Sequence, residues 1–223
     1  MDTKTPKNTY ILEILNMIEK YSKKEKPVNI IISGMSCSGK TTLARNLEEV
    51  AAGAAIIHQD DYFKNLNDLP RYNGYVSCDG LDAFRLERFI KDANSIMGFA
   101  SIKGPLYDMS NNRVVEDCAV YKKPEFIRIY EGLHTGILLN DKVLPEDIQV
   151  PVVDKTIPVV GEKIHVHLQP GYEECLRRRI DRDAKMFVLP AVKVKKYFDE
   201  VIWPVYEKYD RLQAEMCDYL IKE

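Results

Sequence analysis

The sequence lacks a long apolar run, a CxxC pair and an excess of charge of one sign. Its 32 Lys and Arg residues against 34 Asp and Glu give a net charge of −2, which provides no broad basic surface for a nucleic acid. The 5 cysteines are scattered and odd in number, so they indicate neither a disulfide framework nor a zinc site. With no apolar span of transmembrane length and no signal-peptide core, we expect a cytoplasmic protein that binds a small ligand and not a membrane.

The length of 223 residues is typical of one main domain. Hydrophobic residues make up 45% and charged residues 30%, and this length allows one substantial core with a small lobe or lid. Residues 10–21 place apolar side chains at helical spacing, so residues 1–27 are expected to form an amphipathic helix and a linker ahead of a domain spanning 28–223. The helix could serve regulation or dimerisation, but packing on the core sheet is the simpler expectation.

A phosphate-binding motif, GMSCSGKT, stands at residues 34–41. Its glycines let successive backbone N–H groups point at phosphate oxygens, Lys40 adds positive charge, and Thr41 offers a hydroxyl to Mg²⁺. An apolar β-branched run at 28–32 and a helical pattern at 42–50 supply the strand and helix that such a loop requires. The residues predicted to bind the nucleotide are Gly34, Met35, Ser36, Cys37, Ser38, Gly39, Lys40, Thr41 and Thr42.

Acidic residues follow two further apolar runs that are typical of buried strands. Asp60 comes after 54–57 and Glu131 after 126–130; in open α/β sheets the ligand lies beyond the carboxyl ends of the strands. Asp60 could accept the proton of an attacking hydroxyl or cap a turn, and the residues alone leave these two readings equal. Glu131 is the candidate to hold Mg²⁺ together with Thr41.

The stretches between these runs contain further candidates. Asp79 precedes a predicted helix over 81–97 and could cap it or face the ligand. Residues 101–123 alternate in polarity between turn residues, which predicts a hairpin or flap. The predicted last strand, 163–168, carries His165 and His167 on one face, where a hydrogen-bonded structural pair is favoured over a metal site.

The helix that starts at Tyr172 is rich in arginine. Such a charge run is usually a solvated face, but planar guanidinium groups can also neutralise a migrating phosphoryl group when a lid closes. The residues that carry this second reading are Arg178, Arg179 and Arg182.

Taken in order, these motifs resemble the uridine kinase-like branch of P-loop kinases, which includes uridine-cytidine kinases and nicotinamide riboside kinases. The resemblance covers roughly 28–209. The segment QDDYFK at 59–64 is similar to the family's Gln-Asp-x-Phe-Tyr, whose Asp is the catalytic base, here Asp60. The resemblance implies that Asp79 grips the ribose hydroxyls. The other residues that it places at the substrate are Tyr62, Phe63, Tyr107 and Arg113.

The same resemblance implies the fold and the moving parts. RRIDRD at 178–183 is similar to the family's arginine lid, expected over about 172–190, with a flap over about 99–124. Glu131 and Gly132 resemble the family's strand end near magnesium. The implied fold is an α/β P-loop NTPase three-layer sandwich with a five-stranded, mostly parallel sheet and flanking helices.

Some residues depart from the pattern of uridine kinases. Residues 110–112, Ser-Asn-Asn, stand where those enzymes place a pyrimidine-reading His, Met186 to Val188 replace the lid's Glu-Arg-Gly, and the N-terminal helix is extra. Trp203-Pro204, in contrast, is closer to the nicotinamide riboside kinases.

The resemblance implies ATP- and Mg²⁺-dependent phosphorylation of the 5′-hydroxyl of a ribonucleoside. Uridine or cytidine is the first expectation; nicotinamide riboside or another small alcohol or sugar is the alternative, and a homo-oligomer is consistent with the family. A non-catalytic ATP sensor would need the P-loop but not Asp60 and Asp79. A GTPase is disfavoured because the sequence has no Asn-Lys-x-Asp motif.

Overall fold

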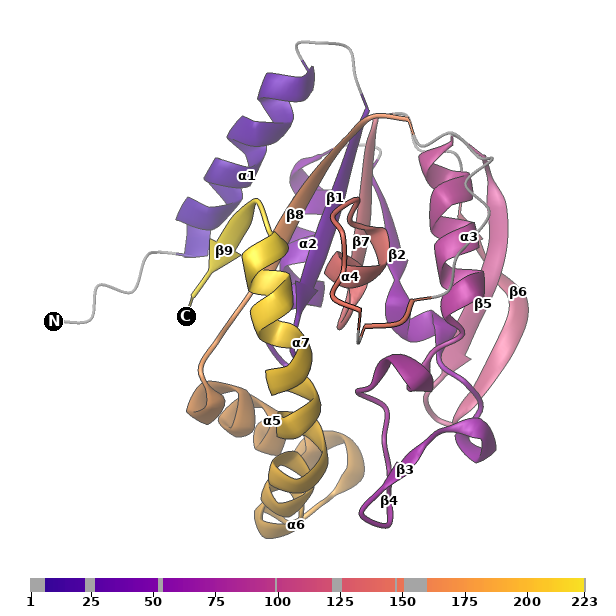
Figure 1. The fold of residues 1–223 in the computed structure, drawn as a ribbon, viewed down its shortest axis with the longest axis vertical. Helices are drawn as coiled ribbons and strands as arrows, with labels where there is room; N and C mark the ends of the chain where they lie inside the picture. The colour runs from indigo at the N-terminus through magenta and orange to yellow at the C-terminus, as the bar shows by residue number, and fades with distance from the viewer. Residues whose placement is uncertain are drawn as a thin grey trace, which may run out of the picture.

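The computed structural model describes residues 7–22, 27–51, 54–98, 100–121, 126–146, 148–150 and 160–222. A parallel sheet of five strands in the order β2-β7-β1-β8-β9 lies at its centre (Figure 1). The strands are β1 (Val28–Gly34), β2 (Ala55–His58), β7 (Ile127–Gly132), β8 (Glu162–Leu168) and β9 (Tyr219–Ile221). The helices are α1 (Lys7–Ser22), α2 (Lys40–Val50), α3 (Leu86–Met97), α4 (Thr135–Leu139), α5 (Tyr172–Phe187), α6 (Ala191–Tyr197) and α7 (Trp203–Met216).

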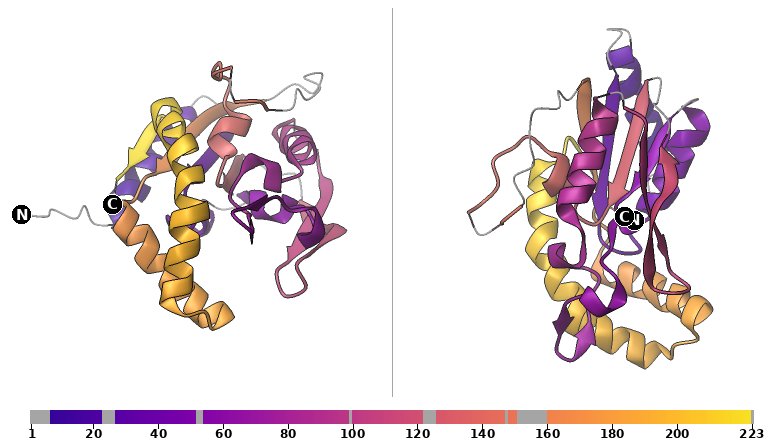
Figure 2. Two further views of the ribbon diagram at one scale, coloured as in Figure 1. Left: turned by 60° about the horizontal axis from the view of Figure 1, so that its bottom comes forward. Right: turned by 90° about the vertical axis from the view of Figure 1, so that its right-hand side faces the viewer.

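Helices cover both faces of this sheet because its central strands are apolar on both sides. Ile30 and Ile32 of β1 pack with α1 and α2 on one face, while Ile31 packs with α3 and α4 on the other. Figure 2 shows α3 and α7 on one side of the sheet and α2 on the opposite side. The predicted three-layer α/β fold is confirmed.

The amphipathic helix α1 packs on the core, as the simpler expectation held. Ile14 and Ile18 are buried in the same cluster as Leu43 and Leu47 of α2. An apolar stripe at i and i+4 therefore finds its partner within the chain. The linker residues 23–26 lie outside the described residues.

Two elements differ from the sequence expectation. The helix predicted over 81–97 is divided into a 3₁₀ turn (Leu81–Ala83) and α3, because the backbone between them bonds elsewhere: Lys64 N donates to Ala83 O and Arg85 N to Tyr62 O. Strand β8 is also not the last, since β9 pairs with it in parallel.

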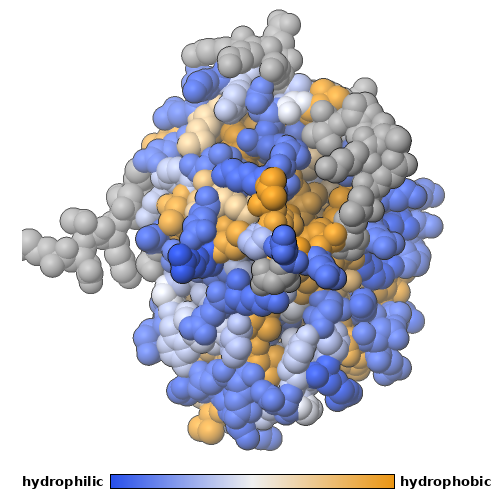
Figure 3. Space-filling model, in the orientation of Figure 1, coloured by the Kyte–Doolittle hydropathy of each residue, from blue (hydrophilic) through white to orange (hydrophobic). Residues whose placement is uncertain are grey.

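Outside the central sheet, the chain forms hairpins of β3 (Arg71–Tyr72) with β4 (Tyr75–Val76), and of β5 (Ile102–Asp108) with β6 (Arg113–Tyr121). The β3–β4 hairpin and the lid lie beyond the carboxyl ends of the strands, whereas the β5–β6 hairpin runs alongside α3 (Figure 1). The β5–β6 hairpin is the predicted flap, of which 99 and 122–124 lie outside the described residues. Helices α5 and α6 and the β3–β4 hairpin gather at one end of the molecule (Figure 1), and the visible surface at this end is mainly hydrophilic (Figure 3).

Candidate active site

The P-loop joins β1 to α2 in a conformation that requires glycine. Gly34 has φ +145° and Gly39 has φ +104°, both in the region that side chains disfavour. A Cβ atom on Gly34 would lie 2.5 Å from Leu168 O. Helix α2 begins at Lys40, so the positive end of its dipole faces the loop. The Lys40 ammonium donates to Met35 O at 2.8 Å and so lies across the same loop.

Glu131 lies beside the start of α2 because β7 pairs with β1. Its Oε1 accepts hydrogen bonds from Thr41 Oγ1 at 3.1 Å and from His58 Nδ1 at 2.6 Å. Burial opposes ionisation of Glu131, but the His58 bond and the Lys40 charge outweigh it and lower the pKa of this carboxyl. The hydrogen bond to Glu131 and the charge of Glu131 in turn raise the pKa of His58, although burial lowers it. Glu131 is thus a buried carboxylate next to the Thr41 hydroxyl.

Asp60 and Asp61 follow β2 in a 3₁₀ turn (Gln59–Tyr62) and have different surroundings. Burial and the charge of Glu131 raise the pKa of Asp60 to about 6, while Lys40 acts in the opposite direction. Asp61 accepts hydrogen bonds from the Tyr107 backbone N–H and the Tyr121 hydroxyl. Asp61 therefore anchors the β5–β6 hairpin, whereas Asp60 is a buried carboxyl with a raised pKa.

Asp79 is a buried carboxyl near two arginines of the lid helix α5, Arg179 and Arg182. Burial raises its pKa, and the charges of Arg179, Arg182 and Lys40 counteract that effect. The carboxylate of Asp183 holds both arginines: Arg179 Nε donates to one oxygen at 2.7 Å and Arg182 Nε to the other at 2.9 Å. Both guanidinium groups also donate to a P-loop hydroxyl, Ser36 Oγ. The lid thus contacts the phosphate loop directly.

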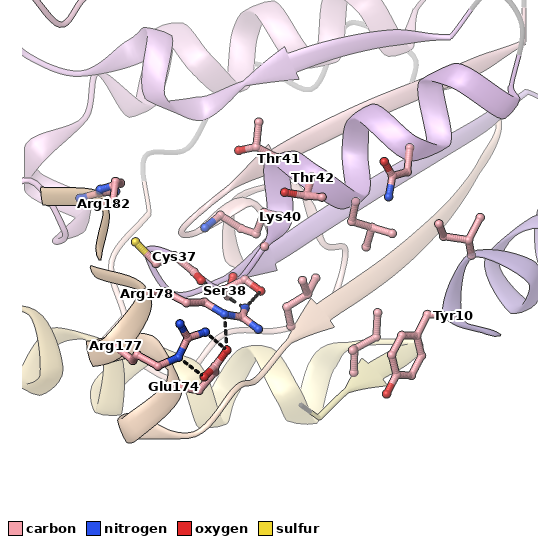
Figure 4. Close-up of a pocket in the computed structure, with 16 residues that line it drawn as sticks. Tyr10, Cys37, Ser38, Lys40, Thr41, Thr42, Glu174, Arg177, Arg178 and Arg182 are labelled. Atoms are coloured by element: carbon pink, nitrogen blue, oxygen red, sulfur yellow. Dashed lines mark hydrogen bonds and ion pairs between the residues drawn. The ribbon is translucent and has the colours of Figure 1, made fainter. Parts of the chain in front are cut away.

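Arg178, the third predicted lid arginine, makes a similar contact. Its Nη1 donates to Ser38 O at 3.1 Å and Cys37 O at 3.4 Å, and its Nε donates to Glu174 at 2.7 Å (Figure 4). The sequence interpretation gave no role to Glu174 or His58, and it included Asp183 only as the last residue of the lid motif. The i,i+4 spacing of Glu174 with Arg178 was an available signal, as was the place of His58 at the end of β2.

The three aromatic residues predicted at the substrate lie in two different places. Phe63 stacks on Phe84 at 4.4 Å between ring centroids and meets Tyr107 edge-on at 5.2 Å. Tyr62, in contrast, is 0% exposed and donates to Asp92 at 3.1 Å, so the structure places it in the core and not beside Phe63 and Tyr107. The 3₁₀ turn points successive side chains in different directions, which separates Tyr62 from Phe63.

Arg113 is also not brought to the P-loop. It lies at the start of β6, next to the turn of the hairpin, with a side chain that is 66% exposed and 3.7 Å from Asp108. The antiparallel pairing of Asp108 with Arg113 places both at the hairpin's end, where solvent surrounds them.

The two histidines of β8 form the expected structural pair. Ser33 Oγ lies 2.7 Å from both His165 Nε2 and His167 Nδ1, and His167 Nε2 lies 2.8 Å from Asp210. All three β-strand side chains are buried. Burial lowers the pKa of His165 to about 3, as expected for a neutral, hydrogen-bonded ring.

A cavity of about 530 Å³ opens beside the P-loop. The P-loop, the first two turns of α2 and the lid form most of it, and α1 and β9 complete it (Figure 4). The residues that line it include Tyr10, Ile11, Cys37, Ser38, Gly39, Lys40, Thr41, Thr42, Asn46, Arg178 and Arg182. A phosphate loop at the mouth of such a cavity is suited to a nucleotide.

A parallel sheet with a P-loop between β1 and α2, an acidic residue after β2, another, Glu131, near the end of β7, and an arginine lid define a P-loop kinase. The family model described as Zeta toxin matches residues 12–89. Human nicotinamide riboside kinase 1 is 31% identical over 188 residues, which are 84% of this chain and 77% of the human protein. Uridine kinase of Mycoplasma genitalium is 26% identical over 201 residues, 88% and 85% of the two chains.

Solved structures agree on the fold. One from Bacillus stearothermophilus, described as a possible uridine kinase, has a TM-score of 0.54 at 16% identity and covers 94% of this chain and 99% of its own. D-glycerate 3-kinase from Cryptococcus neoformans has a TM-score of 0.60 at 11% identity, with coverage of 96% and 94%. The chain belongs to the uridine kinase-like family of P-loop kinases, and it is a phosphotransferase that acts on an alcohol.

The donor groups beside the P-loop fit a magnesium ion. A carboxylate and a hydroxyl, Glu131 and Thr41, lie 3.1 Å apart, and Mg²⁺ prefers a few such oxygen ligands together with substrate phosphates. The part of the chain that the structure describes contains no group of three or more His, Cys, Asp or Glu side chains placed to hold a metal.

Among the described residues there is also no helix long and apolar enough to span a membrane.

Proposed function

We propose that this enzyme transfers the γ-phosphoryl group of ATP, with Mg²⁺, to the 5′-hydroxyl of a ribonucleoside. The observation that supports this most directly is the meeting of Lys40, Asp60 and Asp79 under the lid arginines. Asp60 interacts electrostatically with Lys40 and Asp79, and Asp79 with Arg179 and Arg182. A phosphate-binding cation and two carboxylates suited to hydroxyl groups thus share one site.

The donor side would hold the triphosphate. Backbone N–H groups of the P-loop and Lys40 bind the β- and γ-phosphates. Thr41 and Glu131 would hold Mg²⁺, which neutralises charge on those phosphates when bound. Arg178, Arg179 and Arg182 stabilise the charge that develops on the transferred group, because their guanidinium groups are already oriented by Glu174 and Asp183.

The acceptor side would prepare the hydroxyl. Asp60 orients the 5′-hydroxyl and accepts its proton while the oxygen forms a bond to the γ-phosphorus and the bond from that phosphorus to the bridging oxygen breaks, which releases ADP. Asp79 accepts hydrogen bonds from the ribose hydroxyls and fixes the direction of attack. Phe63 and Tyr107 provide an aromatic wall for the base.

Nicotinamide riboside is the acceptor that the site favours. The acceptor side is acidic, with Asp60 and Asp79 both near enough to Lys40 for its charge to act on them, and an aromatic wall next to carboxylates suits a pyridinium ring, which is planar and positively charged. The segment 110–112 contains no histidine to read a pyrimidine. Uridine and cytidine are the second candidates, because uridine kinases also align with most of the chain.

A coupled ADP-release assay with ATP and Mg²⁺ tests the proposal. The panel contains nicotinamide riboside, uridine, cytidine, adenosine and simple sugars, and mass spectrometry locates the new phosphate. We expect the highest kcat/KM for nicotinamide riboside and phosphorylation at the 5′-oxygen. Turnover of sugars alone would contradict a nucleoside acceptor. ATP binding without ADP release across the whole panel would favour a sensor.

A further inference from the structure

The cavity beside the P-loop has two ends of different chemistry. Lys40, Thr41 and Arg182 lie at one end, and Tyr10 lies at the opposite end (Figure 4). Around Tyr10 the lining is apolar, with Ile11 of α1 and Ile221 of β9, the strand that packs against Tyr10 through Tyr219. If the triphosphate occupies the charged end, as the proposed function requires, the nucleobase of the donor extends toward the apolar end.

Helix α1 supplies the outer wall of this apolar end. Tyr10 is half-buried and packs edge-on against Tyr219 of β9, with 6.5 Å between ring centroids. The Tyr219 hydroxyl in turn donates to Glu13, one turn further along α1. Since Ile14 is fully buried against α2, the helix that carries Tyr10 is held on two sides. The ring of Tyr10 is therefore held against Tyr219 in the absence of a ligand.

Asn46 provides a polar group in the same wall region. It lies on α2, within the cavity lining, and is partly buried. Its side-chain amide makes no hydrogen bond to other residues in the described parts of the chain. An amide offers one acceptor and one donor side by side, the pattern that matches the amino group and ring nitrogen of adenine.

We infer that α1 forms one wall of the binding site for the donor's purine base, with Tyr10 packing on the base and Asn46 hydrogen-bonding to its edge. This inference rests on the proposed function, because it takes the P-loop as the triphosphate site. It gives the N-terminal helix, which is extra relative to the family pattern, a role in donor recognition in addition to its packing role.

Binding measurements with two probes test the inference. ATP contacts both ends of the cavity, whereas tripolyphosphate contacts only the charged end, so isothermal titration with each probe separates the two ends. We expect Tyr10→Ala and Tyr10→Leu to weaken ATP binding roughly 5- to 150-fold, the range of aromatic stacking on a base, with tripolyphosphate binding unchanged. Tyr10→Phe should bind ATP normally, and Asn46→Ala should weaken ATP binding about 3- to 10-fold.

The controls separate this inference from the proposed function. Leu12→Ala changes a residue of α1 that is 59% exposed and should alter neither affinity. Tyr10→Leu keeps apolar volume against Tyr219, so it tests the ring if Tyr10→Ala unfolds. Unchanged ATP binding in Tyr10→Leu, or equal losses for both probes, would overturn the inference. If the unmodified protein binds neither probe, the proposed function itself fails.

Discussion

The donor half and the acceptor half of this site are built in different ways. The phosphate loop at the centre of the donor half is one continuous stretch, 34–42, whose backbone conformation is set by Gly34 and Gly39, and Glu131 and the lid arginines are added to it. The acceptor half brings together Asp60 and Asp79 from separate loops, with a wall from a hairpin. A site made from one stretch depends on local backbone geometry, whereas a site made from several depends on how the whole sheet and its loops pack.

The largest expected effect comes from substituting Asp60, the proposed base, because this change should affect catalysis at the acceptor half and leave ATP binding at the donor half intact. Asp60→Asn should lower kcat by roughly 10²- to 10⁴-fold, because the hydroxyl loses its proton acceptor, with the Kd for ATP nearly unchanged. Asp61→Asn is the matched control, since the carboxylate of Asp61 accepts its hydrogen bonds from the hairpin. Steady-state kinetics and titration calorimetry check both. Near-normal turnover in Asp60→Asn would remove Asp60 from this role.

A second substitution acts on the acceptor half alone. Asp79→Asn should raise the KM for the nucleoside roughly 10- to 100-fold, since hydrogen bonds to a charged group contribute about 1.5–3 kcal/mol. The KM for ATP should change little. A comparable rise in the KM for the nucleoside and the KM for ATP would mean that Asp79 acts through the lid arginines. Asp79 would then not belong to the acceptor half alone.

The pH profile provides a third test. Because the pKa of Asp60 is raised to about 6, log kcat/KM should fall with a slope of about 1 below pH 6 and be level above it. The sign follows from the role: the base must be ionised to accept a proton. The inflection should be absent from the residual activity of Asp60→Asn, and an inflection below pH 5 in the native enzyme would contradict the assignment.

The same raised pKa has a consequence for stability. The folded state holds the Asp60 proton more tightly than the unfolded state does, so this group lowers stability as pH rises from about 4 to 6. Asp60→Asn should therefore unfold at a higher temperature than the native enzyme at pH 7.5, and at a similar temperature at pH 4. Calorimetric scans at both pH values measure this difference.

The smallest expected effect concerns Tyr62, which the sequence predicts at the substrate and which the structure places in the core. Tyr62→Phe removes the hydrogen bond to Asp92 and should lower the free energy of unfolding by about 1 kcal/mol, with both KM values unchanged. Urea denaturation and steady-state kinetics measure the two quantities. A nucleoside KM raised tenfold without loss of stability would restore Tyr62 to the substrate site.

Local sequence determined the P-loop, the strands that lead to Asp60 and carry Glu131, and the amphipathic α1, because glycine conformations, apolar runs and helical spacing are properties of short stretches. Tertiary structure alone decided that Tyr62 enters the core, that Arg113 stays at the hairpin's end, and that α1 lines the cavity. Strand β9 is three residues long and exists because it pairs with β8. Such features have no signal of their own in the sequence, since their stability comes from contacts with residues far away along the chain.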